Sequence, residues 1–359
     1  MNDWDDLLRL VMLGRPIAER DLRGLDARGR ALGGAVFDAA KLDGARFDGC
    51  DLRRARFVRC DLAHASFDGA LLDHCAFIDC ALPQARFSHA TPRLASWSGC
   101  DLRGADFGGA CLVLCTLVRC TLDGASLRAA RMERSTLLAS VIGTLDLGDA
   151  RLVQCVVNGA DLRHARLSGI GADGAVLIGA DLSGQDLSGA VLVRCSLMQA
   201  RLDATCLAAA DLAETSFARA SLVGADLSAV RAPRAMFLGA ALERCVFDGA
   251  LLEQAVFQDA VVSDCRLAQA RLAMSVWNGA TLRRACFAGA DLSYARIEDA
   301  NGETVDWRGA RLDHASFQRS TICGADYTGA STQGLAATDA FLAAARARAY
   351  AYPILEETP

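Results

Sequence analysis

A five-residue period runs through this chain and restricts it to very few folds. From Leu32 to Tyr327, sixty five-residue units follow one another with no insertion or deletion. A large apolar residue occupies the central position, i, in 56 units, and position i−2 is Ala in 37, Cys in 11 and Ser or Thr in 6. Neither a helix nor an ordinary strand has this period. Residues i−2 and i therefore share one face of a short extended segment, and the chain turns at i+1 and i+2.

The turn positions favour a closed coil. Glycine is frequent at i+2, as at Gly44, Gly104 and Gly184, where its lack of a Cβ permits a positive φ. Four such corners close a square coil of 20 residues, so sixty units make about 15 coils. Phenylalanine and tryptophan fill two inward columns, but they are absent from both between about residues 117 and 207. We expect an all-β solenoid whose core is aromatic towards both ends and aliphatic in the middle.

The repeat resembles the pentapeptide-repeat family, whose motif reads Ala-(Asp/Asn)-Leu-x-x. Matching units include Ala160-Asp161-Leu162, Ala225-Asp226-Leu227 and Ala290-Asp291-Leu292. The resemblance covers roughly residues 30 to 330 and implies a right-handed quadrilateral β-helix. Because the family has several roles, the resemblance constrains the fold much more than the function.

Short helices are expected at both ends of the repeat. Trp4, Leu7, Leu8 and Val11 follow a helical stripe, and a second helix is predicted from Thr338. Solenoid ends expose core and unpaired strand edges, so these helices are interpreted as caps, with docking or dimerisation as the alternative. The predicted organisation is an N-terminal helix at 1–15, a β-helix at 16–330, and a C-terminal helix and tail at 331–359.

Composition excludes several classes of function. The formal net charge of −5 gives no basic footprint for direct nucleic-acid binding. No apolar stretch is long enough to span a membrane. Acidic residues near the N-terminus argue against a signal peptide, and fifteen cysteines without one indicate a reducing, cytoplasmic location and free thiols.

No catalytic, cofactor-binding or metal-binding set emerges from the repeat register. The five histidines all occupy i+2 corners and do not pair with a nucleophile. Cys60, Cys80, Cys100 and Cys120 are one coil apart, but no histidine or carboxylate shares their column. They are interpreted as small core residues. We therefore expect a protein that is not an enzyme and that carries no cofactor.

Four units lack a large central residue: those of Pro92, Ala172, Ala232 and Gly302. Three of these breaks share one column, so they predict local dents along one edge. Tolerated irregularity is the simpler interpretation, because solenoids accept imperfect units.

One outward column is unusually apolar and is the candidate protein-binding stripe. Its members lie at position i+1 on the face of the Phe37 column: Val58, Ile78, Val118, Leu138, Ile178, Met198 and Leu238. An exposed apolar stripe is typical of an association surface. Strand propensity is the competing explanation, but it does not account for Leu138, Met198 and Leu238, which are not β-branched.

Three functional hypotheses remain. The first is a non-enzymatic scaffold that binds a protein partner, with a homodimer through the same stripe left open. A type VI secretion accessory is a special case, indicated by resemblance of the N-terminal helix and Asp21-Leu22-Arg23-Gly24 to such proteins. The alternative is a DNA-mimicking protector of a type II topoisomerase such as gyrase, implied by the quinolone-resistance members of the family. The interspersed arginines weaken that alternative.

Overall fold

The chain folds into a parallel β-solenoid of about 16 turns with one short helix near the N-terminus. The computed structural model describes residues 4–337, so the helix predicted from Thr338 lies outside the described residues. The predicted solenoid is confirmed, with about one turn more than expected. Strand β1 (Ile17–Ala18) supplies an additional turn ahead of the counted repeat, because Ile17 pairs with Phe37. The chain divides into two compact units between Asp181 and Leu182, and each is described separately.

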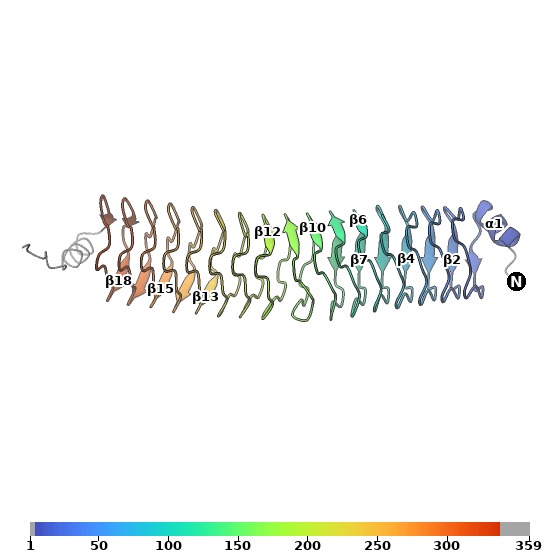
Figure 1. Ribbon diagram of the computed structural model, residues 1–359, viewed down its shortest axis with the longest axis horizontal. Coiled ribbons are helices and arrows are strands. Elements are labelled where there is room, and N and C mark those ends of the chain that lie inside the picture. The colour runs from blue at the N-terminus through green and yellow to red at the C-terminus, as the bar shows by residue number, and fades with distance from the viewer. Residues whose placement is uncertain (1–3, 338–359) are drawn as a thin grey trace, which may run out of the picture. The chain divides into compact units, whose positions relative to one another are not determined.

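The first unit contains the helix and two sheets (Figure 1). Within each sheet, successive strands come from successive coils. A seven-stranded parallel sheet is built from β1, β2 (Val36–Asp38), β3 (Arg56–Val58), β4 (Ala76–Ile78), β5 (Ser96–Ser98), β7 (Thr116–Val118) and β9 (Thr136–Leu138). The other sheet of this unit contains β6 (Cys111–Val113), β8 (Arg131–Glu133), β10 (Arg151–Val153) and β11 (Gly171–Asp173).

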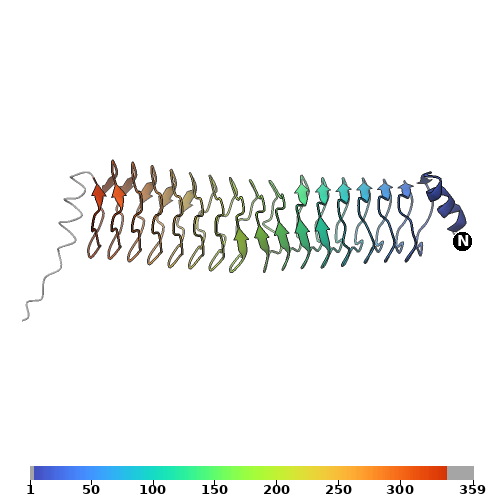
Figure 2. The same ribbon diagram turned by 90° about the horizontal axis from the view of Figure 1, so that it is seen from above.

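The second unit repeats this plan (Figure 2). A five-stranded parallel sheet contains β13 (Ala241–Glu243), β14 (Val261–Ser263), β15 (Thr281–Arg283), β16 (Asn301–Glu303) and β18 (Thr321–Cys323). Strand β12 (Val191–Val193) precedes it, and β17 (Ser316–Phe317) pairs with β19 (Ala336–Ala337).

Every strand pair and bridge has a register of 20 residues. Phe37 pairs with Phe57 and Val261 with Thr281, and single bridges such as Lys41–Asp61 maintain the same offset on the faces without regular strands. A residue therefore lies directly beside the residues 20 positions before and after it. Residues that recur every 20 positions in the sequence thus form a column in the structure.

The core consists of stacked aromatic columns, as predicted. In the first unit Phe37, Phe57, Phe77 and Trp97 stack face to face at centroid distances of 4.8–5.5 Å. Their edges meet the second column of rings, of which Phe107 is the last in this unit. From Leu117 to Leu177 the central core residues are aliphatic and buried. Aromatic columns recur in the second unit, from Phe217 to Tyr327.

The corners hold position i+2 in the left-handed region, and glycine is only one of the residues found there. Gly44 has φ +66°, but Arg54, Leu94 and Tyr294 have φ values between 57° and 64°. Left-handed backbone costs a residue with a Cβ on the order of 1 kcal/mol or more. The coil therefore imposes the corner geometry even where the residue does not favour it.

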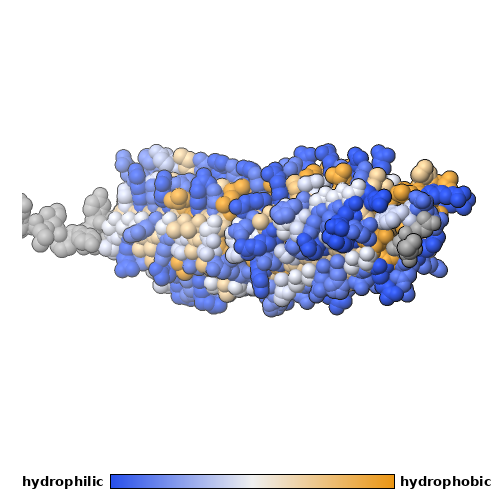
Figure 3. All heavy atoms as spheres, turned by 45° about the vertical axis from the view of Figure 1, so that its right-hand side comes forward, coloured by the Kyte–Doolittle hydropathy of each residue, from blue (hydrophilic) through white to orange (hydrophobic). Residues whose placement is uncertain are grey.

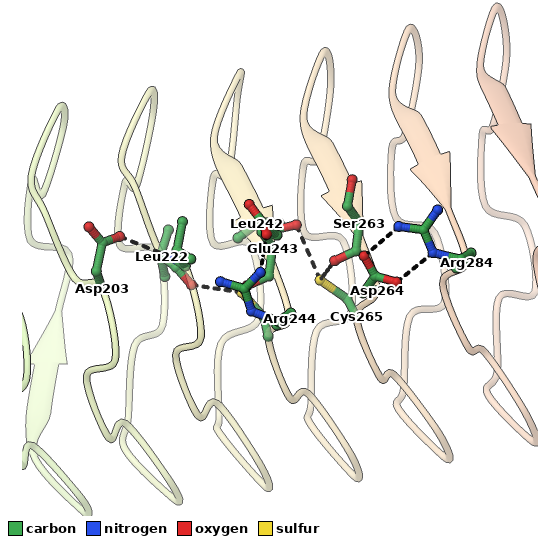
Figure 4. Close-up of polar contacts among 11 residues, drawn as sticks. Asp203, Leu222, Leu242, Glu243, Arg244, Ser263, Asp264, Cys265 and Arg284 are labelled. Carbon is green, nitrogen blue, oxygen red and sulfur yellow. Dashed lines mark hydrogen bonds and ion pairs between the residues drawn. The ribbon is translucent and has the colours of Figure 1, made fainter.

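The inward i−2 residue also makes a hydrogen bond, which the sequence reasoning missed. The thiols of Cys245 and Cys265 donate to the carbonyls of Leu222 and Leu242, 23 residues earlier, at 2.9 and 3.2 Å (Figure 4). The Ser135 hydroxyl donates to the Leu112 carbonyl in the same way. Cysteine, serine and threonine share position i−2 because each can donate to this carbonyl. The interpretation of these cysteines as plain small hydrophobes was incomplete.

The four breaks are accommodated within the coils. Pro92 has no N–H, and the bridge of its coil moves to Arg93, which pairs with Val113. Ala172 and Ala232 are buried in the core. At Gly302 an added Cβ would lie 2.8 Å from the Leu282 carbonyl oxygen, so the backbone comes too close for a side chain.

Helix α1 (Trp4–Met12) packs against the first coil, as Figures 1 and 2 show. Leu7 is buried, the Arg30 guanidinium lies 4.7 Å from the centroid of the Trp4 ring, and Asp6 forms an ion pair with Arg20 at 2.7 Å. These contacts hold the helix against the first coil. Its role as a cap, or alternatively in docking or dimerisation, stays a prediction.

Candidate protein-binding surface

The stripe residues of the first unit form an aligned ladder on the seven-stranded sheet. Asp38 pairs with Val58, Val58 with Ile78, Ile78 with Ser98, Ser98 with Val118, and Val118 with Leu138. Beyond Leu138 the bridges Thr136–Val156 and Val156–Val176 continue the offset to Asn158 and Ile178. All five predicted residues of this unit thus occupy one column, which Ser98 and Asn158 interrupt.

The ladder lies on the solvent-facing side of the sheet. Phe57, Phe77 and Trp97, one position before the ladder residues, are buried, whereas the ladder residues are half-buried or exposed. Leu138 retains 43% of its surface, and Val141, around the next corner, retains 61%. Val141 was not predicted, because it lies at position i−1 of the neighbouring face. The signal that could have identified Val141 is its closeness to Leu138 across the corner.

The second unit has a separate apolar group on the face of its Phe217 column. Met198 and Leu238 are 39% and 40% exposed, and Met236 is 43% exposed. Met236 bridges to Val256, which bridges to Val276. Ala218, between Met198 and Leu238 in the column, is nearly buried. The space-filling view shows the apolar surface as patches between hydrophilic ones (Figure 3).

Charged corners border the ladder of the first unit. Arg59 forms an ion pair with Asp38 across adjacent coils. Asp79 and Arg119 occupy the equivalent corner one coil and three coils further on, and neither forms an ion pair with any residue in 4–337. Gly99 lies at the corner between them, so these two opposite charges are exposed and two coils apart.

Many outward carboxylates elsewhere form ion pairs, some along one strand and others between adjacent coils. Asp161 accepts from Arg163 at 2.7 and 2.9 Å, and this hydrogen bonding lowers the pKa of Asp161 to about 2. Arg23 and Arg28 lower the pKa values of Asp21 and Asp26 to about 2 in the same way. The pattern Asp-Leu-Arg at i−1, i and i+1 places the two charged side chains on the same outward face.

Polar and sulfur-containing side chains do not converge in the described part of the chain. No group of three His, Cys, Asp or Glu side chains within residues 4–337 is arranged to hold a metal ion. His64 contacts Asp43 at 3.0 Å, and His314 stacks on Tyr294 at 4.9 Å. Burial raises the pKa of the Cys75 thiol, and that of Cys115 to about 11. All fifteen cysteines are thiols in this structure.

A shallow hollow of about 390 Å³ lies across the corners of three successive coils in the first unit. Its lining consists of Gly33, Asp51, Arg53, Arg54, Asp73 and His74. Arg53 and Asp51 form an ion pair at 2.7 Å in its lining, so these two charges compensate each other. Among residues 4–337, no helix has the length and apolar character to cross a membrane.

Solved structures similar to this chain include pentapeptide-repeat proteins at low identity. A trypsin-treated form of QnrB1, a plasmid-mediated fluoroquinolone resistance protein, is 22% identical, covering 55% of this chain and 90% of its own, with a TM-score of 0.39. HetL, involved in heterocyst differentiation regulation in Nostoc sp. strain PCC 7120, is 19% identical, covering 94% of this chain and 98% of its own, with a TM-score of 0.18. No curated protein sequence matches the chain.

Family models account for most of the repeat. The model for the pentapeptide repeat region matches residues 50–127. The model for pentapeptide repeats (8 copies) matches 21–59 and five overlapping segments between 175 and 299. Together with the five-residue period and the stacked coils, these matches show that the chain belongs to the pentapeptide-repeat family.

Proposed function

We propose that the protein is a non-enzymatic scaffold that binds a protein partner through the apolar ladder of its first unit. The aligned column of Val58, Ile78, Val118 and Leu138 carries the proposal. These apolar side chains point outward on successive coils, where core packing does not require them. The apolar group of Met198, Met236 and Leu238 is a second contact area of the same kind on the second unit.

The chemistry of the described residues supports a binding role over catalysis. A positioned nucleophile, base or metal set is what catalysis would use, and the outward histidines and cysteines are dispersed at separate corners and coils. An uninterrupted core of side chains leaves little room for the enclosed pocket that small substrates prefer. A role in type VI secretion stays a prediction from the sequence alone.

The alternative, a DNA-mimicking topoisomerase binder, is less well supported. Three of the acidic residues that would form the mimic are close to arginines: Asp161 and Asp181 contact Arg163, and Asp146 lies 3.9 Å from Arg166. Such pairing reduces the negative potential that a phosphate backbone would present. We expect no potent inhibition of DNA gyrase supercoiling. Strong inhibition that is lost on reversing Asp146, Asp161, Asp181 and Asp186 would establish the alternative instead.

The scaffold proposal is tested by changing Val118, Leu138 and Ile178 together to Lys. These outward substitutions should leave the circular dichroism spectrum and the unfolding midpoint nearly unchanged but remove the proteins that co-purify with the wild type. A matched control changes Thr121, Ser126 and Ser168 to Lys, which adds the same charge on other faces. A folded ladder variant that retains every partner and the wild-type oligomeric state would show that the ladder is not the interface.

A further inference from the structure

The ladder of the first unit is chemically symmetric about its centre. Nine coils contribute one outward residue each, in the order Ala18, Asp38, Val58, Ile78, Ser98, Val118, Leu138, Asn158 and Ile178. Counted outward from Ser98, both directions read apolar, apolar, polar, apolar. A sequence that only needed strand formers would have no reason to follow this mirrored order.

A mirrored order suits a twofold interface. In an isologous dimer the same patch serves both copies, so residue a contacts b and b contacts a. A twofold axis lying between two such faces, parallel to the strands and passing over β5, reverses the order of coils but keeps each column opposite itself. It places Val58 opposite Leu138 of the second copy, and Ile78 opposite Val118.

Charges on the neighbouring columns agree with this axis. The same rotation places Asp79 opposite Arg119 of the second copy, and Arg119 opposite its Asp79. Neither Asp79 nor Arg119 forms an ion pair within residues 4–337. Arg59 meets Ala139 and Arg56 meets Thr136, so neither of these arginines faces another arginine.

The centre of the face carries small side chains of its own. Strand β5 presents only Ser96 and Ser98 outward, and Gly99 follows at the corner. The Asp79 carboxylate lies over this glycine, since a Cβ built on Gly99 would come within 2.3 Å of Asp79 Oδ1. Small residues on the axis allow the flanking apolar side chains to reach across to the second copy.

We propose that this face binds a second copy of the chain, forming a symmetric homodimer with the two coil stacks antiparallel and β5 on the twofold axis. The inference rests on the proposed use of the ladder as a binding surface and specifies its partner. Nine coils at about 4.8 Å by three residues at about 3.3 Å give a flat face of roughly 400 Å² per copy. Such an area is at the low end for specific interfaces, so the dimer should dissociate in the micromolar range.

Sedimentation equilibrium of the full chain across about 1–100 μM tests the proposal. The expected mass rises from 37.9 kDa towards twice that value. Asp79→Arg places a second arginine opposite Arg119, and Arg119→Asp places two aspartates together, at two symmetric contacts. Each should weaken dimerisation about tenfold, whereas the double exchange should return the affinity to within about threefold of wild type.

Cross-linking locates the axis. In a Cys323→Ser background, Ser98→Cys should be joined to its counterpart by a short bis-maleimide, because only residues on the axis meet their own copies. Ser126→Cys, on another face, is the control and should remain monomeric on a denaturing gel. A monomer at 100 μM, or a dimer that responds to neither charge exchange, would overturn the dimer proposal. If the triple lysine variant then still lost its co-purifying proteins, the scaffold proposal would stand without it.

Discussion

The three buried tryptophans differ in one hydrogen bond, and this difference predicts opposite effects of two single substitutions. Trp277 Nε1 donates to Ser275 Oγ at 2.8 Å, two residues earlier at position i−2. Trp97 has Ala95 at that position, and its Nε1 is buried with no hydrogen-bond partner among the described residues. A serine at position i−2 thus accepts the hydrogen bond of the Trp277 indole, whereas the coil of Trp97 has no such serine.

Ser275→Ala should destabilise the protein by about 1–3 kcal/mol, because it leaves a buried indole N–H without an acceptor. Ala95→Ser should have the opposite sign. Its hydroxyl can accept from Trp97 and donate to the carbonyl of Leu72, 23 residues earlier, as Ser135 donates to Leu112. We expect a gain of about 1 kcal/mol, the net value of a typical hydrogen bond.

Urea unfolding followed by circular dichroism measures both effects as shifts of the midpoint. A change of 1–3 kcal/mol corresponds to roughly 0.3–1 M at the slopes of proteins this size. Ala55→Ser is the matched control, since it adds the same hydroxyl on the same face beside Phe57, which has no donor. If Ala95→Ser is no more stable than Ala55→Ser, the unpaired indole is not a significant cost and the reasoning fails.

Three further predictions follow from the corners, the ion pairs and the thiols. Gly189→Ala should destabilise by about 1 kcal/mol in the same urea assay, because φ is +63° there although nothing within 4 Å opposes a Cβ; an unchanged midpoint would mean that the corner relaxes. The lowered pKa values of Asp21, Asp26 and Asp161 contribute stability that is complete above the unfolded value near 4 and is lost as pH falls towards 2. Changing Arg23, Arg28 and Arg163 to Gln should therefore flatten the fall in melting temperature between pH 4 and 2, and an equal fall in both proteins would contradict the assignment. Thiol titration in denaturant without reductant should count fifteen, and a count that increases after reduction would reveal disulfides.

The five-residue period was sufficient to predict the coil, the register and the core. With 20 residues per turn, the positions of Phe37, Phe57 and Phe77 already imply a stacked column, and the structure has it. Three-dimensional detail was harder to predict. The hydrogen bond from an i−2 thiol to a carbonyl 23 residues earlier depends on how closely two coils approach, which the repeat does not encode explicitly.

The candidate surface was likewise predictable in part, in its column but not in its ion pairs. The sequence placed Val58, Ile78, Val118 and Leu138 in one outward column, and the strand register confirms that placement. It did not reveal that Asp79 and Arg119 form no ion pair within residues 4–337 while Arg59 does, because side-chain pairing at a corner depends on rotamers and on the neighbouring coil. Whether the column binds a protein remains a prediction.

The inward cysteines can also report which coils separate from their neighbours. Eleven thiols at position i−2 are distributed over several coils from Cys50 to Cys265. Burial keeps those such as Cys75 and Cys115 protonated at neutral pH, so an alkylating reagent reacts with them only when their coil separates from its neighbour. Pulsed alkylation followed by peptide mass analysis would therefore rank individual coils by their opening free energy, without introducing a label.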